Sequence, residues 1–272
     1  MLLAIDIGNT NVSFGLYRGE HLLRTWSLST DLRRTSDEYE IQIDNWFQRA
    51  GHSPLEVHGV VIGNVVPPLQ SRFERVVRHL FNVAPWSVSG RSGVLGLRLD
   101  VDNPLEVGAD RIANAVACYR RYGGPAIVVD MGTATTFDVI SEDGAYLGGA
   151  IAPGVQIAAE ALFERAAKLP RVELAPPPSA IGRNTIHAMQ SGTVYGYAGL
   201  VRGVIERIQA ELPSRARIVA TGGLAEVVAR HSNVFDAVDR HLTLDGLRLL
   251  YVMNHPEFAA PHPEAAHGGL NA

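Results

Sequence analysis

Residues 1–16 read MLLAIDIGNTNVSFGL, and this stretch decides the fold. The uninterrupted apolar run Leu2–Ile5 is typical of a strand that is buried on both faces. The alternation of Val12, Phe14 and Leu16 predicts a second strand that returns beside the first. The polar and glycine residues between the two strands therefore form the turn of a hairpin.

The turn has the composition of an anion-binding loop. Gly8 tolerates positive φ and leaves no side chain in the way of a ligand. Asn9, Thr10 and Asn11 offer amide and hydroxyl donors around it. Asp6 stands at the mouth of the turn, where a divalent metal would be needed between its carboxylate and a phosphate. A hairpin with an ordinary polar turn is the alternative interpretation of a single motif of this kind.

A second copy of the pattern favours the functional interpretation. Residues 126–140 read AIVVDMGTATTFDVI, which is again an apolar strand, an acid, a glycine, several threonines and an alternating strand. When Asp6 is aligned with Asp130, Gly8 falls on Gly132. The interval between the copies is about one domain length, so the sequence predicts a duplicated domain and not a solenoid of short repeats.

The chain length fits two such domains. With 272 residues the chain can form two lobes of roughly 100 to 150 residues, each with its own core. We expect an N-terminal lobe at residues 1–110 and a C-terminal lobe at 111–254. Residues 255–272 are rich in Pro, Ala, Gly and His, and we expect a disordered tail there.

Charge and composition exclude several classes of function. The net charge of -4 and the pI near 6.2 favour neither nucleic acid nor an anionic membrane as a partner. No apolar window reaches the roughly 18 residues that a spanning helix needs, and no signal peptide precedes the first strand, so we expect a cytoplasmic protein. The single cysteine, Cys118, cannot form an internal disulfide and lies in a helical pattern, as a small core residue would.

Lysine is almost absent from the chain. Lys168 is the only lysine among 24 basic residues, and no G-x-x-x-x-G-K-[ST] motif is present. A phosphate site in this protein must therefore rely on backbone amides, hydroxyl groups, a metal and arginine.

A helix is predicted to begin just after Gly108. Asp110 and Arg111 then fall in its first turn, where free amides and the helix dipole stabilise an acid. An ordinary helix-start residue is one interpretation of Asp110. Adjacent helical residues point about 100° apart, so the two side chains are also free to contact other groups, such as a hydroxyl for Asp110 and a carboxylate for Arg111.

Further glycines stand at helical spacing in the second half of the chain. A nearly bare helix face is formed by Gly192, Gly196, Gly199 and Gly203. Each interior glycine costs about 1 kcal/mol of helix propensity relative to alanine, so close packing against this face is expected. A tight helix crossing within the chain and a homodimer contact are equally compatible with it. A separate pair, Gly222 and Gly223, lies between a predicted strand and a helix, where an adenosine could bind.

The two hairpins resemble those of the acetate and sugar kinase, Hsp70 and actin superfamily. A narrower likeness to type III pantothenate kinases rests on four motifs: D-I-G-N-T at 6–10, N-P-L-E-V-G-A-D-R at 103–111, D-M-G-T-A-T-T at 130–136 and G-G-A-I-A-P-G at 148–154. The likeness covers nearly the whole chain to about residue 254. It implies an α/β fold of two duplicated actin-like (ribonuclease H-like) lobes, with mixed sheets flanked by helices and an ATP cleft between them.

The resemblance also implies an activity and a set of site residues. The activity is phosphorylation of pantothenate by ATP to 4'-phosphopantothenate, the first committed step toward coenzyme A, in a homodimer. The implied ATP-binding residues are Asp6, Ile7, Gly8, Asn9, Thr10, Asn11, Val12, Ser13 and Thr133. The implied pantothenate-binding residues are Gly108, Ala109, Asp110, Arg111 and Thr185.

Within this set, the resemblance gives Asp110 the role of the base that takes the proton of the primary hydroxyl. Asp6 would lie near Mg²⁺, and Asp130 would hold a monovalent cation, K⁺ or NH₄⁺. That cation would supply positive charge that other kinases take from lysine. One departure is Val101, where some relatives have a tyrosine that contacts the substrate.

Two other functions remain as alternatives. A protein of this fold could act as a non-catalytic accessory factor or transcriptional regulator, or it could phosphorylate another small molecule, such as a sugar or acetate. The presence of Asp6, Asp110, Arg111 and Asp130 favours an active enzyme, and the G-A-D-R segment favours pantothenate.

Overall fold

The computed structural model describes residues 1–166 and 169–258, which form two compact units. Unit 1 comprises Met1–Gly96, Asn103–Ala117 and the described residues from Thr243 on. Unit 2 comprises Leu97–Asp102 and Cys118–Leu242. The division differs from the expected boundary after residue 110, because it falls inside a helix and assigns the last long helix to unit 1.

Unit 1 is built on a mixed sheet of five strands in the order β3-β2-β1-β4-β5. The strands are β1 (Leu2–Ile7), β2 (Asn11–Arg18), β3 (His21–Ser29), β4 (Gly59–Asn64) and β5 (Trp86–Ser87). The predicted hairpin is confirmed, because β1 pairs antiparallel with β2. On its other side β1 pairs parallel with β4.

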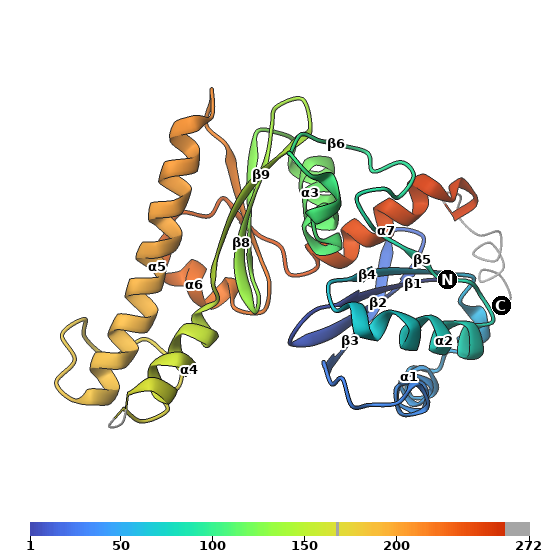
Figure 1. The fold of residues 1–272 in the computed structure, drawn as a ribbon, viewed down its shortest axis with the longest axis horizontal. Helices are drawn as coiled ribbons and strands as arrows, with labels where there is room; N and C mark the ends of the chain where they lie inside the picture. The colour runs from blue at the N-terminus through green and yellow to red at the C-terminus, as the bar shows by residue number, and fades with distance from the viewer. Residues whose placement is uncertain (167–168, 259–272) are drawn as a thin grey trace, which may run out of the picture. The chain divides into compact units, whose positions relative to one another are not determined.

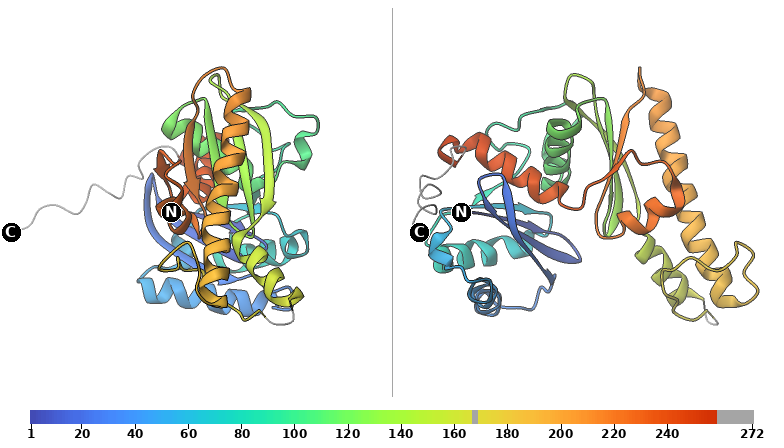
Figure 2. Two further views of the ribbon diagram at one scale, coloured as in Figure 1. Left: turned by 90° about the vertical axis from the view of Figure 1, so that its left-hand side faces the viewer. Right: turned by 180° about the vertical axis from the view of Figure 1, so that it is seen from behind.

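One face of this sheet is covered by α1 (Ser36–Ala50) and α2 (Gln70–Phe81) (Figures 1 and 2). Helix α1 begins with a capping box in which Thr35 and Glu38 satisfy each other's backbone N–H groups, and it ends at Gly51 in the left-handed conformation. Short 3₁₀ turns, η1 (Pro54–Glu56) and η2 (Pro67–Leu69), precede β4 and α2. The core on this face joins the odd-numbered residues of β1 to aromatic side chains of both helices, such as Phe47 and Phe73.

Two further helices of unit 1 pack closely at positions where the chain has glycine and therefore no side chain. They are α7 (Leu242–Asn254) and the first part of α3 (Ala109–Tyr122), which follows η3 (Pro104–Glu106). A Cβ at Gly59 would overlap the Tyr251 ring, and one at Gly63 would lie 2.9 Å from a Leu247 methyl. These glycines let α7 approach β4 closely. The position of α7 in unit 1 therefore depends on contacts between residues that are far apart in the sequence.

The described chain continues past α7 into η4 (Pro256–Phe258). His255 stacks on Tyr251 with ring centroids 4.1 Å apart, and its N–H donates to the Tyr251 carbonyl at 2.9 Å. Residues 255–258 of the expected tail thus lie against the end of α7 in the structure. Its remaining part, 259–272, lies outside the described residues.

Unit 2 repeats the strand order of unit 1. Its sheet runs β6-β9-β8-β7-β10-β11, so β9-β8-β7-β10-β11 corresponds to β3-β2-β1-β4-β5, and β6 is an additional edge strand. The strands are β6 (Arg98–Leu99), β7 (Ala126–Met131), β8 (Ala134–Ile140), β9 (Ala145–Pro153), β10 (Arg217–Thr221) and β11 (Ala237–Val238). The pairings of β7 with β8 and β10 are again antiparallel and parallel. The predicted α/β fold of two duplicated lobes with mixed sheets is confirmed.

The helices of unit 2 are α4 (Val155–Arg165), α5 (Thr185–Glu211) and α6 (Ala225–Ser232). The core that they share with the sheet includes Ile127 and Val129 of β7 and Val201 and Ile205 of α5. In the described part of the chain no helix is both long and apolar enough to cross a membrane. Cys118 is buried, and this burial raises the pKa of its thiol to about 12, as befits a core residue.

The crossing of α7 over α3 generates a stability prediction. A Cβ at Gly246 would overlap the backbone of Ala113, which cannot move without shifting α3. Gly246→Ala should lower the free energy of unfolding by about 1–3 kcal/mol, even after the gain in helix propensity. Urea unfolding followed by circular dichroism measures this, and a variant as stable as the parent would contradict the close crossing.

Candidate active site

The first hairpin places Asp6 at the carboxyl end of two parallel strands. Asp6 pairs in register with Ser13 of β2 and with Gly63 of β4. Its neighbours Ile5 and Ile7 point into the core formed with α1 and α2, so Asp6 points to the other face of the sheet. The crevice at the carboxyl ends of parallel strands is where open α/β sheets bind ligands.

The loop of this hairpin is short and exposes its polar residues. Gly8 donates its N–H to the carbonyl of Asn11 at 3.0 Å, which closes the turn. Asn9, Thr10 and Asn11 are exposed, as a loop that receives a charged ligand requires. A Cβ at Gly8 would lie 3.0 Å from the Asn11 carbonyl oxygen, so a side chain fits there only if the turn opens slightly.

The second hairpin repeats this arrangement with a loop that is one residue shorter. Two residues separate β7 from β8, whereas three separate β1 from β2. Gly132 donates its N–H to the Ala134 carbonyl at 3.1 Å. Asp130 pairs with Thr136 and, on the parallel side, with Thr221. The alignment of Asp6 and Gly8 with Asp130 and Gly132 therefore holds in the strands, and Thr136 takes the place of Ser13.

Helix α3 begins where the sequence predicts, with Ala109 as its first residue and Asp110 in its first turn. The Asp110 carboxylate accepts the N–H of Arg111 at 2.8 Å. Burial raises the pKa of the Asp110 carboxyl group above its usual value, and this outweighs the lowering by the Arg111 N–H and guanidinium. A Cβ at Gly108 would overlap a carboxylate oxygen of Asp110, so glycine leaves the space that this carboxylate occupies.

The start of α3 lies at the same strand end as Asp6. Gly63 is the partner of Asp6 in the parallel register, and a Cβ at Gly63 would lie 3.6 Å from the Ala109 Cβ. The residues predicted for the phosphate loop and the residues Gly108–Arg111 are thus close neighbours within unit 1. The family resemblance implies this proximity, but composition and spacing do not indicate it, because about 45 residues separate β4 from α3.

In unit 2, the loop after β10 is close to Asp130. Gly222 has φ 92°, a conformation that favours glycine, and a Cβ there would lie 2.6 Å from a carboxylate oxygen of Asp130. The expected position of Gly222 and Gly223 between a strand and a helix is confirmed. Thr133 lies in the neighbouring hairpin loop, where its carbonyl accepts the N–H of Gly154 at 3.2 Å.

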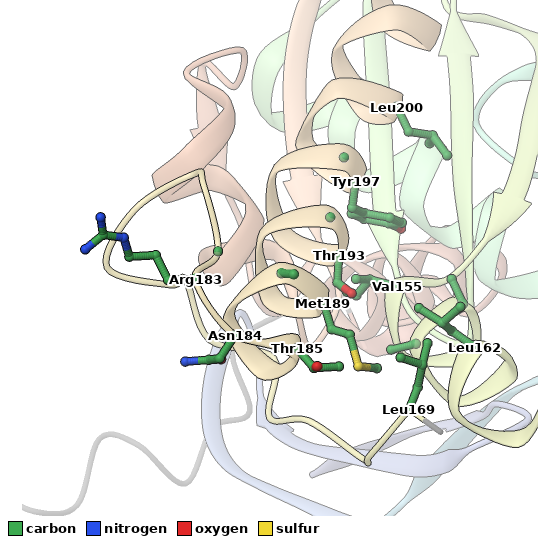
Figure 3. A pocket seen from close by; sticks show the side chains of 16 residues that line it. Val155, Leu162, Leu169, Arg183, Asn184, Thr185, Met189, Thr193, Tyr197 and Leu200 are labelled. Atoms are coloured by element: carbon green, nitrogen blue, oxygen red, sulfur yellow. The ribbon is translucent and has the colours of Figure 1, made fainter. Parts of the chain in front are cut away.

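Thr185 lies elsewhere in unit 2, at the first position of α5. Asn184 caps this helix by accepting the N–H of His187 at 2.8 Å, which fixes Thr185 in the first turn. Thr185 is among the residues that line a cavity of about 780 Å³ between α4, α5 and the segment that joins them. Figure 3 shows Met189 on α5 on the side of the helix that faces Leu162 and Leu169.

The sequence does not predict this cavity, which is lined mainly by apolar side chains and glycines. Small residues at helical spacing, Gly192 and Gly196, were the only signal for it, and they lie on its wall. A buried hydrogen bond between Thr135 of β8 and Tyr197 of α5 holds one side of the cavity and was also missed. The cause is the same in both cases, since residues from distant segments meet only in the fold.

No group of three or more His, Cys, Asp or Glu side chains among the described residues could form a cage for a metal ion. Mg²⁺ needs no such cage, because it is commonly held by one or two carboxylates together with substrate phosphates and water. Asp6, a single carboxylate beside the loop of the first hairpin, fits that pattern.

The comparisons of sequence agree on one family. The sequence profile of the type III pantothenate kinases matches residues 2–207. A type III pantothenate kinase from Roseiflexus sp. (strain RS-1) is 54% identical over 254 residues, which cover 93% of this chain and 99% of that protein. One from Myxococcus xanthus (strain DK1622) is 52% identical over 255 residues, with 94% and 99% covered.

Solved structures with lower identity share the fold. A Baf family protein from Campylobacter jejuni superposes with a TM-score of 0.58 at 22% identity, covering 94% of this chain and 99% of that one. An inorganic polyphosphate/ATP-glucomannokinase from Arthrobacter sp. strain KM gives 0.52 at 13% identity, with 93% and 99% covered. These likenesses show the architecture of two mixed sheets flanked by helices.

Proposed function

Because the chain belongs to the type III pantothenate kinase family, we propose that it transfers the γ-phosphoryl group of ATP to the primary hydroxyl of pantothenate, giving 4'-phosphopantothenate. One observation in unit 1 carries the mechanism. A partly buried carboxylate, Asp110, begins a helix at the same strand end as the Asp6 hairpin. The proposal thus places an acceptor for the substrate proton beside a loop for the nucleotide phosphates.

Asp110 acts in this proposal as the general base. A primary alcohol has a pKa far above 7, so a carboxylate that accepts its proton as the new bond forms accelerates transfer, by roughly 10² to 10⁴ in comparable cases. The raised pKa of Asp110 makes it a stronger base than an exposed aspartate. Its partial burial also keeps the carboxylate from being fully solvated by water.

The nucleotide phosphates are assigned to the two hairpin loops. In unit 1 the loop is part of residues 6–13, with exposed side chains at its tip, and in unit 2 it includes Thr133. Asp6 would bind Mg²⁺ together with phosphate oxygens, and the metal would offset the charge that develops during transfer. Hydroxyl and amide donors suit this task in a chain with one lysine.

Pantothenate is assigned to Gly108–Arg111 and to Thr185. Arg111 is partly exposed in the first turn of α3, and its guanidinium suits the carboxylate of the substrate. Asp110 then meets the hydroxyl at the other end of the same small molecule. Thr185 offers a hydroxyl at the wall of the apolar cavity of unit 2.

A monovalent cation is assigned to Asp130, whose carboxylate lies against Gly222. K⁺ or NH₄⁺ at this position would add positive charge near the phosphates in a chain whose single lysine is Lys168. Replacing K⁺ and NH₄⁺ by Na⁺ in the assay should therefore lower kcat by about tenfold or more. Equal rates in the three salts would argue against a cation at Asp130.

A homodimer that uses the glycine face of α5 is the assembly we propose. All four glycines, 192, 196, 199 and 203, are exposed, and a Cβ at any of them meets no atom within 4 Å in the described chain. No tight crossing within the described part of the chain therefore covers these glycines. Large apolar side chains around the same helix are also exposed, including Ile186 and Leu200. A second copy that packs against this face would bury both features.

The dimer interface can be tested by filling the glycine face. Gly199→Leu adds a side chain where the protomer has open space, so the fold should be kept while close approach of a second helix is blocked. Light scattering after size exclusion should then report a monomer, with an unchanged far-ultraviolet spectrum. Glu211→Leu, about 120° around the same helix, is the matched control and should remain dimeric.

A coupled ADP-release assay tests the activity. Purified protein with Mg²⁺, K⁺ and ATP should turn over with pantothenate at least 100-fold faster than with glucose or acetate, because Arg111 and Asp110 suit a carboxylate and a hydroxyl on one substrate. Faster turnover of glucose or acetate would indicate a different small-molecule kinase. Absence of turnover on all three substrates would favour a regulator of the same fold.

Asp110→Asn is the control variant for the same assay. It should lower kcat by roughly 10² to 10⁴ while ATP binding is retained, because only the proton acceptor is lost. For the parent protein, activity requires the ionised carboxylate. Since burial raises the pKa of Asp110, the acidic limb of kcat/KM should lie at a higher pH than an ordinary aspartate would give. A limb near pH 4 or below would exclude Asp110 as this base.

A further inference from the structure

Thr30, the residue that follows β3, makes two hydrogen bonds to the loop of the first hairpin. Its hydroxyl donates to the carbonyl of Gly8 at 2.6 Å, and its N–H donates to the carbonyl of Thr10 at 2.8 Å. We propose that Thr30 is a positioning residue that orients the peptide groups of this loop for the nucleotide phosphates. The inference rests on the proposed function, because it takes the loop to be the phosphate site.

The physical reason lies in the planarity of the peptide bond. In a trans peptide the C=O and the following N–H point in opposite directions, so the bond from Thr30 to the Gly8 carbonyl also sets the direction of the Asn9 N–H. In the described chain no acceptor takes the Asn9 N–H, which leaves it available to an anion. A carbonyl turned toward a phosphate would instead repel it, and Thr30 prevents this at Gly8 and Thr10.

The equivalent place in unit 2 shows that the side-chain bond is not a general consequence of the topology. Gly154 follows β9 as Thr30 follows β3, and its N–H likewise donates to a loop carbonyl, that of Thr133. A Cβ at Gly154 would overlap the Thr133 carbonyl and lie 2.7 Å from the Gly132 oxygen. Of the two hairpins, only the first has room for a side chain at this position and a hydroxyl group that donates a hydrogen bond to the loop.

Thr30 is itself held by the helices of unit 1. The next residue, Asp31, has its carbonyl bound by the hydroxyl of Tyr39, a fully buried side chain of α1, at 3.0 Å. Arg72 of α2 donates to the carbonyls of Leu32 and Arg34 at 2.5 and 3.0 Å. The segment after β3 is therefore fixed to both helices, so it can hold the loop in one orientation.

The test compares Thr30→Val with Thr30→Ser. Valine keeps the shape and the backbone bond to Thr10 but removes the hydroxyl, so KM for ATP and the Kd of MgATP should rise roughly 5- to 30-fold. KM for pantothenate should stay within about twofold. Serine keeps the hydroxyl and should restore both constants to near the parent values. Thr25→Val, at an exposed position of β3, is the matched control and should change neither.

Calorimetric titration with MgATP keeps this test separate from that of the proposed function. If the parent binds MgATP but does not phosphorylate pantothenate, the proposed activity is wrong. The comparison of Kd values for MgATP then still decides the role of Thr30. A Thr30→Val protein with the parent's Kd overturns the proposal. So does a variant in which the affinities for ATP and pantothenate fall together with a lower Tm, because that is the result of a purely structural role.

Discussion

The parallel pairing of β1 with β4 is the interaction on which the position of the candidate site depends. It brings Gly63 beside Asp6 and ends both strands at the same edge of the sheet. Because side chains alternate along a strand, the burial of Ile5 and Ile7 against α1 and α2 turns Asp6 to the opposite face. A shift of one residue in this register would bury the carboxylate in the apolar core, so the register is strongly determined.

The face that carries Asp6 is shaped by missing side chains. Glycines at positions 59 and 63 allow α7 to pack directly on β4, and Gly63 also leaves space for Ala109 at the start of α3. The helix that bears Asp110 therefore begins at the strand end, and the carboxylate of Asp110 is partly buried. The raised pKa of this carboxyl group is a consequence of packing, because desolvation outweighs the favourable Arg111 interactions.

The two hairpins share their strand pairing but differ in what supports them. Thr30 braces the loop that follows Asp6 through a side chain, whereas Gly154 supports the loop that follows Asp130 through its backbone alone. The second loop is also one residue shorter. Duplication has thus preserved the backbone arrangement of the strands, and the side chains around each loop have diverged.

Local patterns in the sequence determined the elements and their ends. The apolar run and alternation at residues 2–16 and the helix start at Ala109 both depend on neighbours within a few residues, and the structure agrees with each of them. Only the tertiary structure decided that α7 packs in unit 1, that Asp6 lies beside the first turn of α3, and that Thr30 holds the Gly8 carbonyl. Periodicity tells which face of an element is apolar, but the partner that covers it is selected by packing between segments far apart in the chain.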